Sequence, residues 1–169
     1  LGVNPTPLMA IPVAGRPITI TVTDVNDNRP IWTQYISPVT LLESAPNGTF
    51  VAAIRAVDVD SGAFGELTYS IVSQDISRPF RIAAQGDGAI ISTNRPLDFE
   101  DTTGSYQLTV QATDGGDRES DTMLIQVSVT DVNEYDPVFI ETSYSCEIAE
   151  NRPAGEFCTQ ITASDADGT

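Results

Sequence analysis

The sequence predicts an all-β protein in which two antiparallel sheets pack face to face as a sandwich. Short runs rich in β-branched and aromatic residues are separated by turn clusters of Gly, Pro, Asn and Asp, a pattern typical of strands joined by tight turns. Within residues 108–112 and 124–129, apolar side chains alternate with polar ones, as half-buried antiparallel strands require. Almost no segment has a helical pattern. The clearest expected strands span residues 51–57, 67–72, 106–112 and 122–129.

The chain also contains an internal repeat. Asp24-Val25-Asn26-Asp27-Asn28 returns as Asp131-Val132-Asn133-Glu134-Tyr135, so the two copies begin at positions 24 and 131, 107 residues apart. At the same offset Glu43 aligns with Glu150, Asp58 with Asp165 and Asp60 with Asp167. A period of this length predicts a Greek-key, seven-stranded immunoglobulin-like sandwich, which takes about 100 residues. The sandwiches are expected to be arranged in tandem.

The period also sets the expected domain boundaries. The complete repeat covers residues 31–130, and two linkers flank it at residues 24–30 and 131–137. Residues 1–23 are interpreted as the C-terminal remnant of a preceding repeat. Residues 138–169 are interpreted as the N-terminal part of the next repeat, with its first two strands. Neither flanking piece can bury a core alone, so the sequence is interpreted as an internal fragment of a longer chain.

Composition argues against several classes of function. The chain has 24 acidic and 8 basic residues, a net charge of -16 and no histidine. The absence of imidazole argues against zinc or copper chemistry, and the acidic charge argues against binding to nucleic acid or to a membrane surface. A hydrophobic content of 40% argues against disorder. No apolar run approaches the length of about 20 residues that a membrane-spanning helix needs.

The repeated cassette is rich in oxygen ligands. Carboxylates and a side-chain amide recur at the joints of the repeat, which is typical of sites for hard cations. Calcium takes about 6 to 8 oxygen ligands from carboxylates, amides and main-chain carbonyls in a tolerant geometry. The same groups repel one another strongly without a cation. The sequence therefore predicts Ca²⁺ sites at the boundaries between sandwiches.

Five motifs follow one another in a fixed order and specify the family further. They are the linker 24–28 followed by Pro30, Leu42-Glu43-Ser44, Asp58-Val59-Asp60, Leu97-Asp98-Phe99-Glu100 and Ala112-Thr113-Asp114. With these motifs the chain resembles the extracellular repeats of cadherins from residue 18 onward. The resemblance implies calcium-dependent cell–cell adhesion or mechanical linkage, in which Ca²⁺ at the joints rigidifies the ectodomain. It also implies an extracellular location in a plasma-membrane protein, and another cadherin-like ectodomain as partner, like-to-like or heterophilic.

The resemblance implies a set of metal ligands at each joint. At the second joint, three calcium ions are expected on Glu43, Asp98, Glu100, Asp131, Asn133, Glu134, Asp165 and Asp167, with Val132 and Tyr135 in the same linker, Tyr135 through its main-chain oxygen. At the first joint the expected ligands are Asp24, Asn26, Asp27, Asp58, Asp60 and Asp114, with the carbonyls of Asn28 and Phe64.

Four positions depart from the family pattern. Glu134 replaces an aspartate, Tyr135 and Phe64 replace asparagines, and Phe99 replaces the commoner arginine between two ligands, where no effect on chelation is expected. At the first joint the glutamate-bearing positions of a preceding repeat are missing. One ion on Asn26, Asp58, Asp60 and Asp114 is therefore expected there, with weaker binding at two other positions.

Three residues are candidates for covalent modification. Cys146 and Cys158 align with Val39 and Val51, which are expected to face inward on the first two strands of a repeat. Inward neighbours can reach disulfide geometry, so a disulfide is predicted, with two buried free thiols as the alternative. Asn47 begins the only Asn-x-Ser/Thr sequon without proline at its middle position, in a predicted turn, and is a candidate glycosylation site.

Two other function classes compete with calcium-dependent adhesion. The first is a calcium-independent β-sandwich that acts as a spacer or protein-binding module of a receptor. The second is an enzyme that uses Asp98 and Glu100 as a glycosidase pair. Catalytic carboxyls of that kind flank a cleft at about 5 to 10 Å, usually on separate elements. Because the chain also lacks histidine and a Gly-x-Ser-x-Gly motif, the sequence predicts no enzyme.

Overall fold

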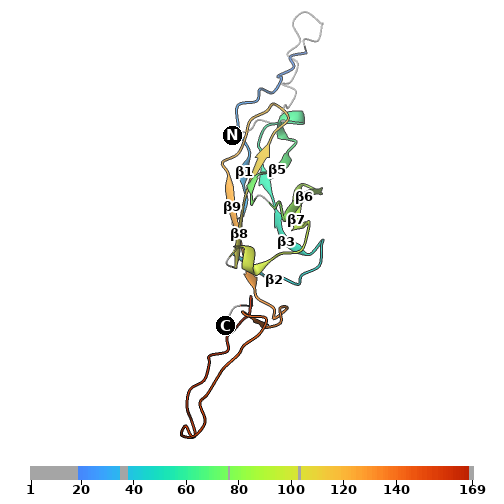
Figure 1. Ribbon diagram of the computed structural model, residues 1–169. Helices are drawn as coiled ribbons and strands as arrows, with labels where there is room; N and C mark the ends of the chain where they lie inside the picture. Colours follow the sequence, from blue (N-terminus) through green and yellow to red (C-terminus); the bar gives the residue numbers. More distant parts are fainter. Residues whose placement is uncertain (1–18, 35–37, 76, 103, 168–169) are drawn as a thin grey trace, which may run out of the picture.

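A computed structural model describes residues 19–34, 38–75, 77–102 and 104–167 (Figure 1). Residues 1–18 of the expected N-terminal remnant lie outside the described residues, and residues 19–23 form no strand. Within the described ranges, eleven strands and two single-turn helices follow in chain order: β1 (Ile31–Trp32), β2 (Val39–Leu42), β3 (Phe50–Ile54), β4 (Ala56–Val57), η1 (Gly62–Gly65), β5 (Thr68–Gln74), β6 (Phe80–Gln85), β7 (Gly88–Thr93), α1 (Phe99–Thr102), β8 (Ser105–Thr113), β9 (Met123–Thr130), β10 (Val138–Phe139) and β11 (Ala163–Ser164).

Seven of the nine strands described between residues 31 and 130 form two sheets that pack as a sandwich. One sheet has the order β2-β9-β8-β5 and the other has the order β3-β7-β6. All pairs are antiparallel except β2 with β9, which are parallel. β1 and β4 form a separate, short antiparallel pair. The all-β sandwich expected from the sequence is confirmed.

The expected strand 51–57 is divided at Arg55. β3 pairs with β7, whereas β4 pairs with β1. Between them the carbonyl of Arg55 accepts hydrogen bonds from the main-chain N–H and the hydroxyl of Thr33, at 3.0 and 2.9 Å. The strand therefore changes partner at this residue, from β7 to β1.

The core lies between the inner faces of the two sheets. Alternate residues of β8 and β9 are buried, as their apolar-polar alternation predicts. Among them Leu108, Val110, Ile125 and Val127 are at most 1% exposed. Ile91 on β7 faces them from the opposite sheet and is fully buried. These side chains hold the two sheets in one relative position, and thereby fix where each strand ends.

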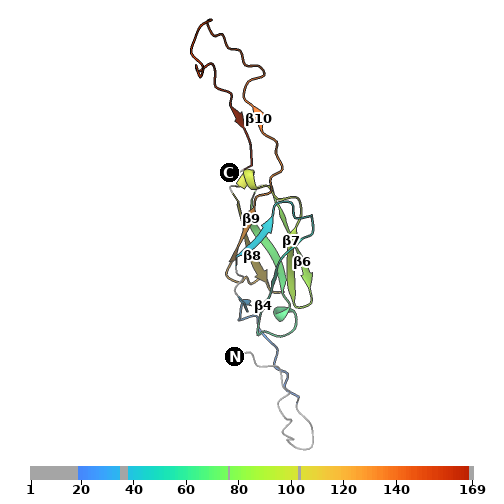
Figure 2. The same ribbon diagram turned by 90° about the horizontal axis from the view of Figure 1, so that it is seen from below.

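The two ends of the sandwich carry the two linkers. Figures 1 and 2 show η1 and α1 at opposite ends of the molecule. The segment before β1 enters at the end that carries η1, and the segment after β9 leaves at the end that carries α1. The two oxygen-rich cassettes of the sequence are thus separated by the full length of the sandwich.

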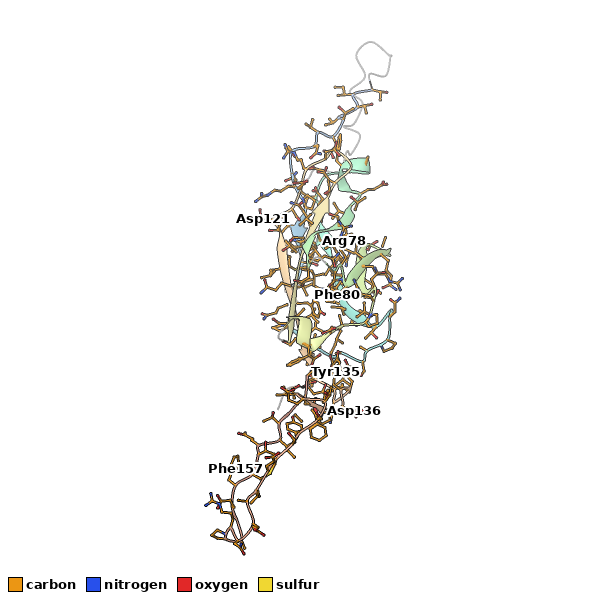
Figure 3. The ribbon with its side chains drawn as sticks, viewed as in Figure 1. Arg78, Phe80, Asp121, Tyr135, Asp136 and Phe157 are labelled. Atoms are coloured by element: carbon orange, nitrogen blue, oxygen red, sulfur yellow. A yellow bond between two sulfur atoms is a disulfide. The ribbon has the colours of Figure 1, made fainter. Side chains whose placement is uncertain are left out.

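Residues 138–167 form an arm that leaves the sandwich and returns to it. Only β10 and β11 pair within this arm, so the expected first two strands of a further repeat are limited to these short pieces. Phe139 and Phe157 are 63% and 77% exposed. In Figure 3, Phe157 lies far out on the arm, whereas Tyr135 and Asp136 lie where the arm begins. An isolated strand pair is marginal in water without further strands to pack against, which explains this open conformation.

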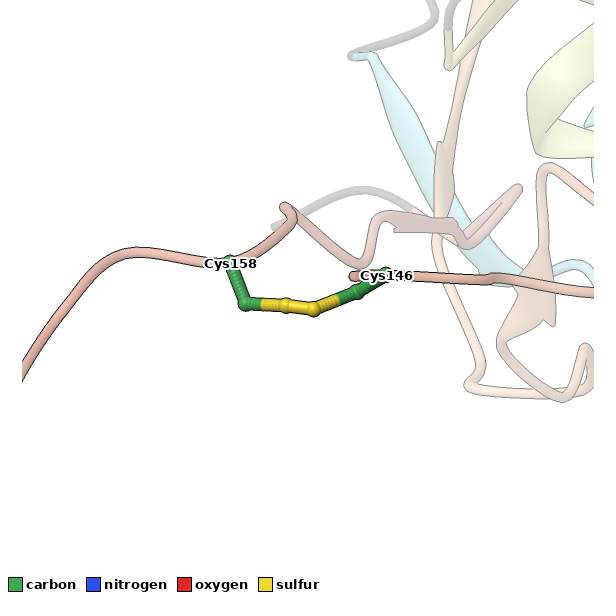
Figure 4. The surroundings of a disulfide bond; sticks show 2 residues. All are labelled: Cys146 and Cys158. Atoms are coloured by element: carbon green, nitrogen blue, oxygen red, sulfur yellow. A yellow bond between two sulfur atoms is a disulfide. The ribbon is translucent and has the colours of Figure 1, made fainter. Parts of the chain in front are cut away.

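Cys146 and Cys158 lie opposite each other on the two halves of the arm and are joined as a disulfide (Figure 4). Their Cα atoms are 5.8 Å apart, within the usual range for such a bond. Both residues are exposed and neither belongs to a strand, which differs from the inward-facing positions expected from the alignment with Val39 and Val51. The difference arises because the arm has no sheet whose faces could be distinguished.

The disulfide gives a testable prediction about the arm. We expect the non-reduced protein to contain no thiol that iodoacetamide can alkylate, and the reduced protein to contain two, as measured by intact mass. In the chain-entropy model, closing a loop of about 15 residues contributes about 3 kcal/mol. Because the bond closes a loop within the arm, the double variant Cys146→Ser/Cys158→Ser should leave unfolding of the sandwich unchanged. Two alkylated cysteines in the non-reduced protein would contradict the bond.

Candidate metal centres

Glu43 occupies the centre of the second joint because two parallel strands end side by side. It follows β2 directly, and β2 runs parallel to β9, so Glu43 lies beside the linker that follows β9. Its side chain is only 2% exposed. One carboxylate oxygen accepts the N–H of Phe99 at 2.9 Å, and the other accepts the N–H of Val132 at 2.5 Å. Glu43 thus ties together β2, the start of α1 and the linker.

Four further carboxylates converge on this position. Glu43, Glu100 and Glu134 can each offer an oxygen within 4.8 Å of one another, and so can Glu100, Asp131 and Asp167. Asp167 reaches the joint from the returning half of the arm. Its oxygens accept the main-chain N–H groups of Glu134 at 3.2 Å and Tyr135 at 2.9 Å. Among the described residues, these are the groups of acidic side chains arranged so that they could hold a metal ion.

Burial, together with the crowding of negative charge, raises the pKa of two of these groups. Burial raises the pKa of Glu100, and the neighbouring carboxylates of Glu43, Asp131 and Asp98 raise it further. Burial also raises the pKa of Glu134, and the negative charges of Glu43 and Asp167 raise it further. Both carboxylate oxygens of Glu100 are buried without a hydrogen-bond partner. Buried carboxylate oxygens are normally paired or bound to a metal, so the residues present here fit a hard cation.

The first joint presents three buried oxygens in the same condition. They are Oδ1 of Asn26, Oδ2 of Asp58 and Oδ2 of Asp114. The second oxygen of each aspartate has a structural role, since Oδ1 of Asp58 accepts the N–H of Asp60 at 3.0 Å. Likewise Oδ1 of Asp114 accepts the N–H groups of Gly116 and Arg118 at 2.7 and 2.9 Å. Each carboxylate is thereby held in place with one oxygen left for a ligand.

The other expected ligands of the first joint already have partners within the protein. Asp60 accepts two hydrogen bonds from Asn28, through its side chain and its main-chain N–H. Although burial opposes ionisation of Asp60, these bonds outweigh it and lower the pKa. Asp24 accepts the N–H and the hydroxyl of Ser61, and Asp27 accepts the side-chain amide of Asn28 at 2.7 Å.

The remaining expected residues lie at the margins of the two joints. Asp98 precedes α1 and lies close enough to raise the pKa values of Glu100 and Glu134. Asp165 accepts the N–H of Asp167 at 3.1 Å, and Asn133 is exposed in the linker. Phe64 lies in η1, half-buried.

Two glycines and a serine contribute to the first joint and were missed as site residues. Ser61 holds Asp24, as described above. The N–H of Gly115 donates to the carbonyl of Ala63 at 3.1 Å, and a Cβ on Gly115 would overlap that carbonyl. A Cβ on Gly116 would overlap the side chain of Asn26. The turn 114–116 was recognisable in the sequence, but its contact with the linker was not.

Comparison with known proteins identifies the family. Residues 37–130 match the family model for the cadherin domain. The chain belongs to the cadherin family. It is 40% identical over 154 residues to the human cadherin EGF LAG seven-pass G-type receptor 2, and the match covers 91% of this chain and 5% of the receptor. It is also 40% identical over 156 residues to the protocadherin-like wing polarity protein stan of Drosophila melanogaster, covering 89% of this chain and 4% of that protein.

Solved cadherin structures share the fold. Repeats EC22-24 of mouse cadherin-23 superpose with a TM-score of 0.77 at 33% identity, covering 90% of this chain and 48% of that one. Extracellular cadherin domains 1-5 of protocadherin gamma B2 give a TM-score of 0.74 at 36% identity, covering 90% and 29%. This cadherin chain thus corresponds to a small part of its relatives. Among its described residues, no helix is long and apolar enough to cross a bilayer.

The close approach of Gly116 to Asn26 predicts the effect of a small substitution. Gly116→Ala should displace the Asn26 amide and weaken the calcium binding expected at the first joint roughly tenfold, the usual effect of disturbing a residue that orients a metal ligand. Titration calorimetry in a Glu43→Ala background, where the second joint is weakened, measures this joint separately. An unchanged first-joint affinity would show that the position of Asn26 does not matter for the metal.

Proposed function

We propose that this chain is part of an extracellular cadherin ectodomain in which calcium ions at the joints hold successive repeats in a fixed orientation. The proposal divides the chain into a complete repeat at 31–130, linkers at 24–30 and 131–137, and parts of neighbouring repeats at 1–23 and 138–169. The observation that carries it is the set of buried oxygens without hydrogen-bond partners at both ends of one sandwich.

At the second joint the residues proposed to hold calcium come from both sides and from the linker. Glu43 and Glu100 belong to the complete repeat, Asp131 and Glu134 to the linker, and Asp167 to the segment beyond it. Bound calcium would supply positive charge that these carboxylates share. The peripheral ligands proposed for the same joint are Asp98, Val132, Asn133, Tyr135 and Asp165.

At the first joint Asn26, Asp58 and Asp114 are proposed as the main ligands, because they present the unpartnered oxygens. The further ligands proposed there are Asp24, Asp27, Asn28, Asp60 and Phe64. Asp60 would exchange hydrogen bonds with Asn28 for metal contacts. We therefore expect weaker binding at this joint than at the second one.

The mechanical consequence follows from electrostatics. Carboxylates gathered at one joint repel one another in the absence of a cation, and the linker between two sandwiches then moves freely. When the same oxygens share ions, the two sandwiches and the linker become one rigid body. A stiff chain of repeats can transmit force and can present its faces to another cadherin ectodomain on a neighbouring cell. The parent protein is proposed to be a plasma-membrane protein with no enzymatic activity in this segment.

Limited proteolysis of a longer fragment that completes the following repeat tests the proposal. Cleavage within residues 131–137 should be at least tenfold slower in 2 mM Ca²⁺ than in chelator. The calcium-bound linker cannot open locally to enter the active site of the protease. Magnesium, which prefers smaller octahedral sites, serves as the control cation. Equal cleavage rates in calcium and chelator would favour the calcium-independent spacer instead.

Asn47 is proposed as an N-glycosylation site of this extracellular protein. Its sequon occupies an exposed turn between β2 and β3, where Gly48 adopts a φ of 90°. Protein secreted from mammalian cells should lose mass when treated with peptide N-glycosidase F, and an Asn47→Gln variant should not. Identical masses before and after treatment of the unsubstituted protein would contradict occupancy.

A further inference from the structure

The outer face of the four-stranded sheet carries no charge. None of the residues of β2, β5, β8 and β9 is Asp, Glu, Lys or Arg, although charged residues make up 19% of the chain and its net charge is -16. The outward positions of the two central strands are mostly Ser, Thr and Gln: Gln107, Thr109, Gln111, Leu124, Gln126 and Ser128.

Charged groups lie next to this face at the ends of two of its strands. Asp75 follows β5 and accepts the main-chain N–H of Gln107 at 3.4 Å. Asp121 precedes β9 and pairs with Arg29 at 3.1 Å. Depletion of charged residues at the centre is one feature of protein interfaces, because a charge buried there would lose its hydration.

Exposed apolar side chains lie on the same face. Leu124 is 55% exposed on β9, Leu42 is 53% exposed on β2 and Val72 is 49% exposed on β5. They stand among hydroxyl and amide groups that can both donate and accept hydrogen bonds. A surface of this kind can pair with a copy of itself, since each polar group finds a suitable partner in either orientation.

We propose that this outer face of β2, β9, β8 and β5, called the neutral face below, docks against the neutral face of a second copy of the chain. The proposal deepens the adhesion function by naming one surface and a like-to-like partner. Two copies of a protein with a net charge of -16 repel each other, and the repulsion at contact is smallest where neither surface is charged. A two-fold axis places such a face against itself, which is the commonest symmetry of homodimers.

The outer face of the other sheet, β3-β7-β6, does carry a charged residue. This residue is Arg81 on β6, whose guanidinium donates to Ser92 on β7 at 3.0 Å. The turn that carries Asn47 also lies on this side, because the N–H of Gly48 donates to the carbonyl of Thr93 at the end of β7 at 2.9 Å. In Figures 1 and 2, β8 and β9 lie on one side of the sandwich and β6 and β7 on the other. A glycan on Asn47 would leave the neutral face uncovered.

The size of the face determines the expected strength of the contact. Four strands about 4.8 Å apart and up to nine residues long, at about 3.3 Å per residue, give a footprint of roughly 500 Å². A stable interface takes about 800 Å² from each partner. One neutral face should therefore support only a weak dimer, with a dissociation constant on the order of 10⁻⁴ M. Strong adhesion would need several repeats acting together.

Sedimentation velocity of the intact chain at protein concentrations up to about 1 mM, in physiological salt and calcium, tests the proposal. The double variant Gln107→Glu/Gln126→Glu places acids on two residues that oppose each other on the central strands, and should weaken dimerisation at least tenfold. Gln107→Arg/Gln126→Arg should weaken it as well. An equimolar mixture of the two variants should restore it, because opposite charges then meet across the interface.

Ala83→Glu on the outer face of the other sheet is the matched control and should leave dimerisation unchanged. Circular dichroism verifies that each variant is folded. A chain that stays monomeric at about 1 mM, acidic variants that dimerise like the unsubstituted chain, or a mixture that does not associate would each overturn the proposal. A single sandwich carries the neutral face, so dimerisation should persist in chelator. Failure of the calcium-locking experiment would therefore leave this result standing.

Discussion

Replacing Glu43 by alanine is expected to abolish most of the stabilisation that calcium gives to the second joint. In calcium, the substitution removes a proposed ligand whose carboxylate joins three segments, and the affinity of the joint should fall at least tenfold, equivalent to about 1.4 kcal/mol. The two main-chain N–H groups of Phe99 and Val132 also lose a charged acceptor. Each such hydrogen bond contributes about 1.5–3 kcal/mol. The measurement is the melting temperature in calcium and in chelator.

The sign of the difference between the two conditions distinguishes a metal ligand from a structural acid. In chelator, the loss of the hydrogen bonds is partly offset by relief of the repulsion that Glu43 exerts on Glu100 and Glu134. The destabilisation should therefore be clearly larger in calcium than in chelator. Glu43→Gln keeps the shape and one acceptor oxygen, and serves as the matched variant. If Glu43→Ala lowers the melting temperature equally in both conditions, Glu43 acts only through its hydrogen bonds.

The parts of the fold that depend on local pattern were predictable from the sequence. The alternation in residues 108–112 and 124–129 placed two central strands correctly, because burial on one face of a sheet leaves a period of two. The break at Arg55 was not predictable, since it depends on hydrogen bonds from Thr33, which follows β1 and is distant in sequence. The exposure of Cys146 and Cys158 also differs from expectation, because the alignment assumed a complete sheet around them.

In the candidate sites too, the residue types were predictable from the sequence and their contacts were not. The repeat period identified the carboxylates at both ends of the sandwich, because each proposed cation ligand is recognisable by residue type. Whether these carboxylates come close together in space depends on where the strands end. Glu43 and Asp131 meet because β2 and β9 are parallel neighbours, a pairing that sequence pattern alone does not reveal. Contacts such as Ser61 with Asp24 and Gly116 with Asn26 join linker and repeat, and have no local signature.

Replacing Leu108 by alanine is expected to cause a large loss of stability in the sandwich itself. Leu108 is 1% exposed at the centre of β8 and belongs to the cluster that joins the two sheets. Truncation of such a leucine costs about 3–5 kcal/mol, through lost burial and the cavity that remains. A domain of this size has a total stability of about 5–15 kcal/mol, so the variant should approach the threshold of unfolding at about 37 °C.

Leu124→Ala provides a control that separates burial from residue type. Leu124 lies on the neighbouring strand opposite Thr109 and is 55% exposed, so the same truncation should change stability by less than about 0.5 kcal/mol. Urea unfolding of both variants should be followed in saturating calcium, so that the joints contribute equally. Because Leu124 belongs to the neutral face, its truncation should instead weaken self-association. Equal destabilisation by the two substitutions would contradict the assignment of inner and outer faces on which both the core and the neutral face depend.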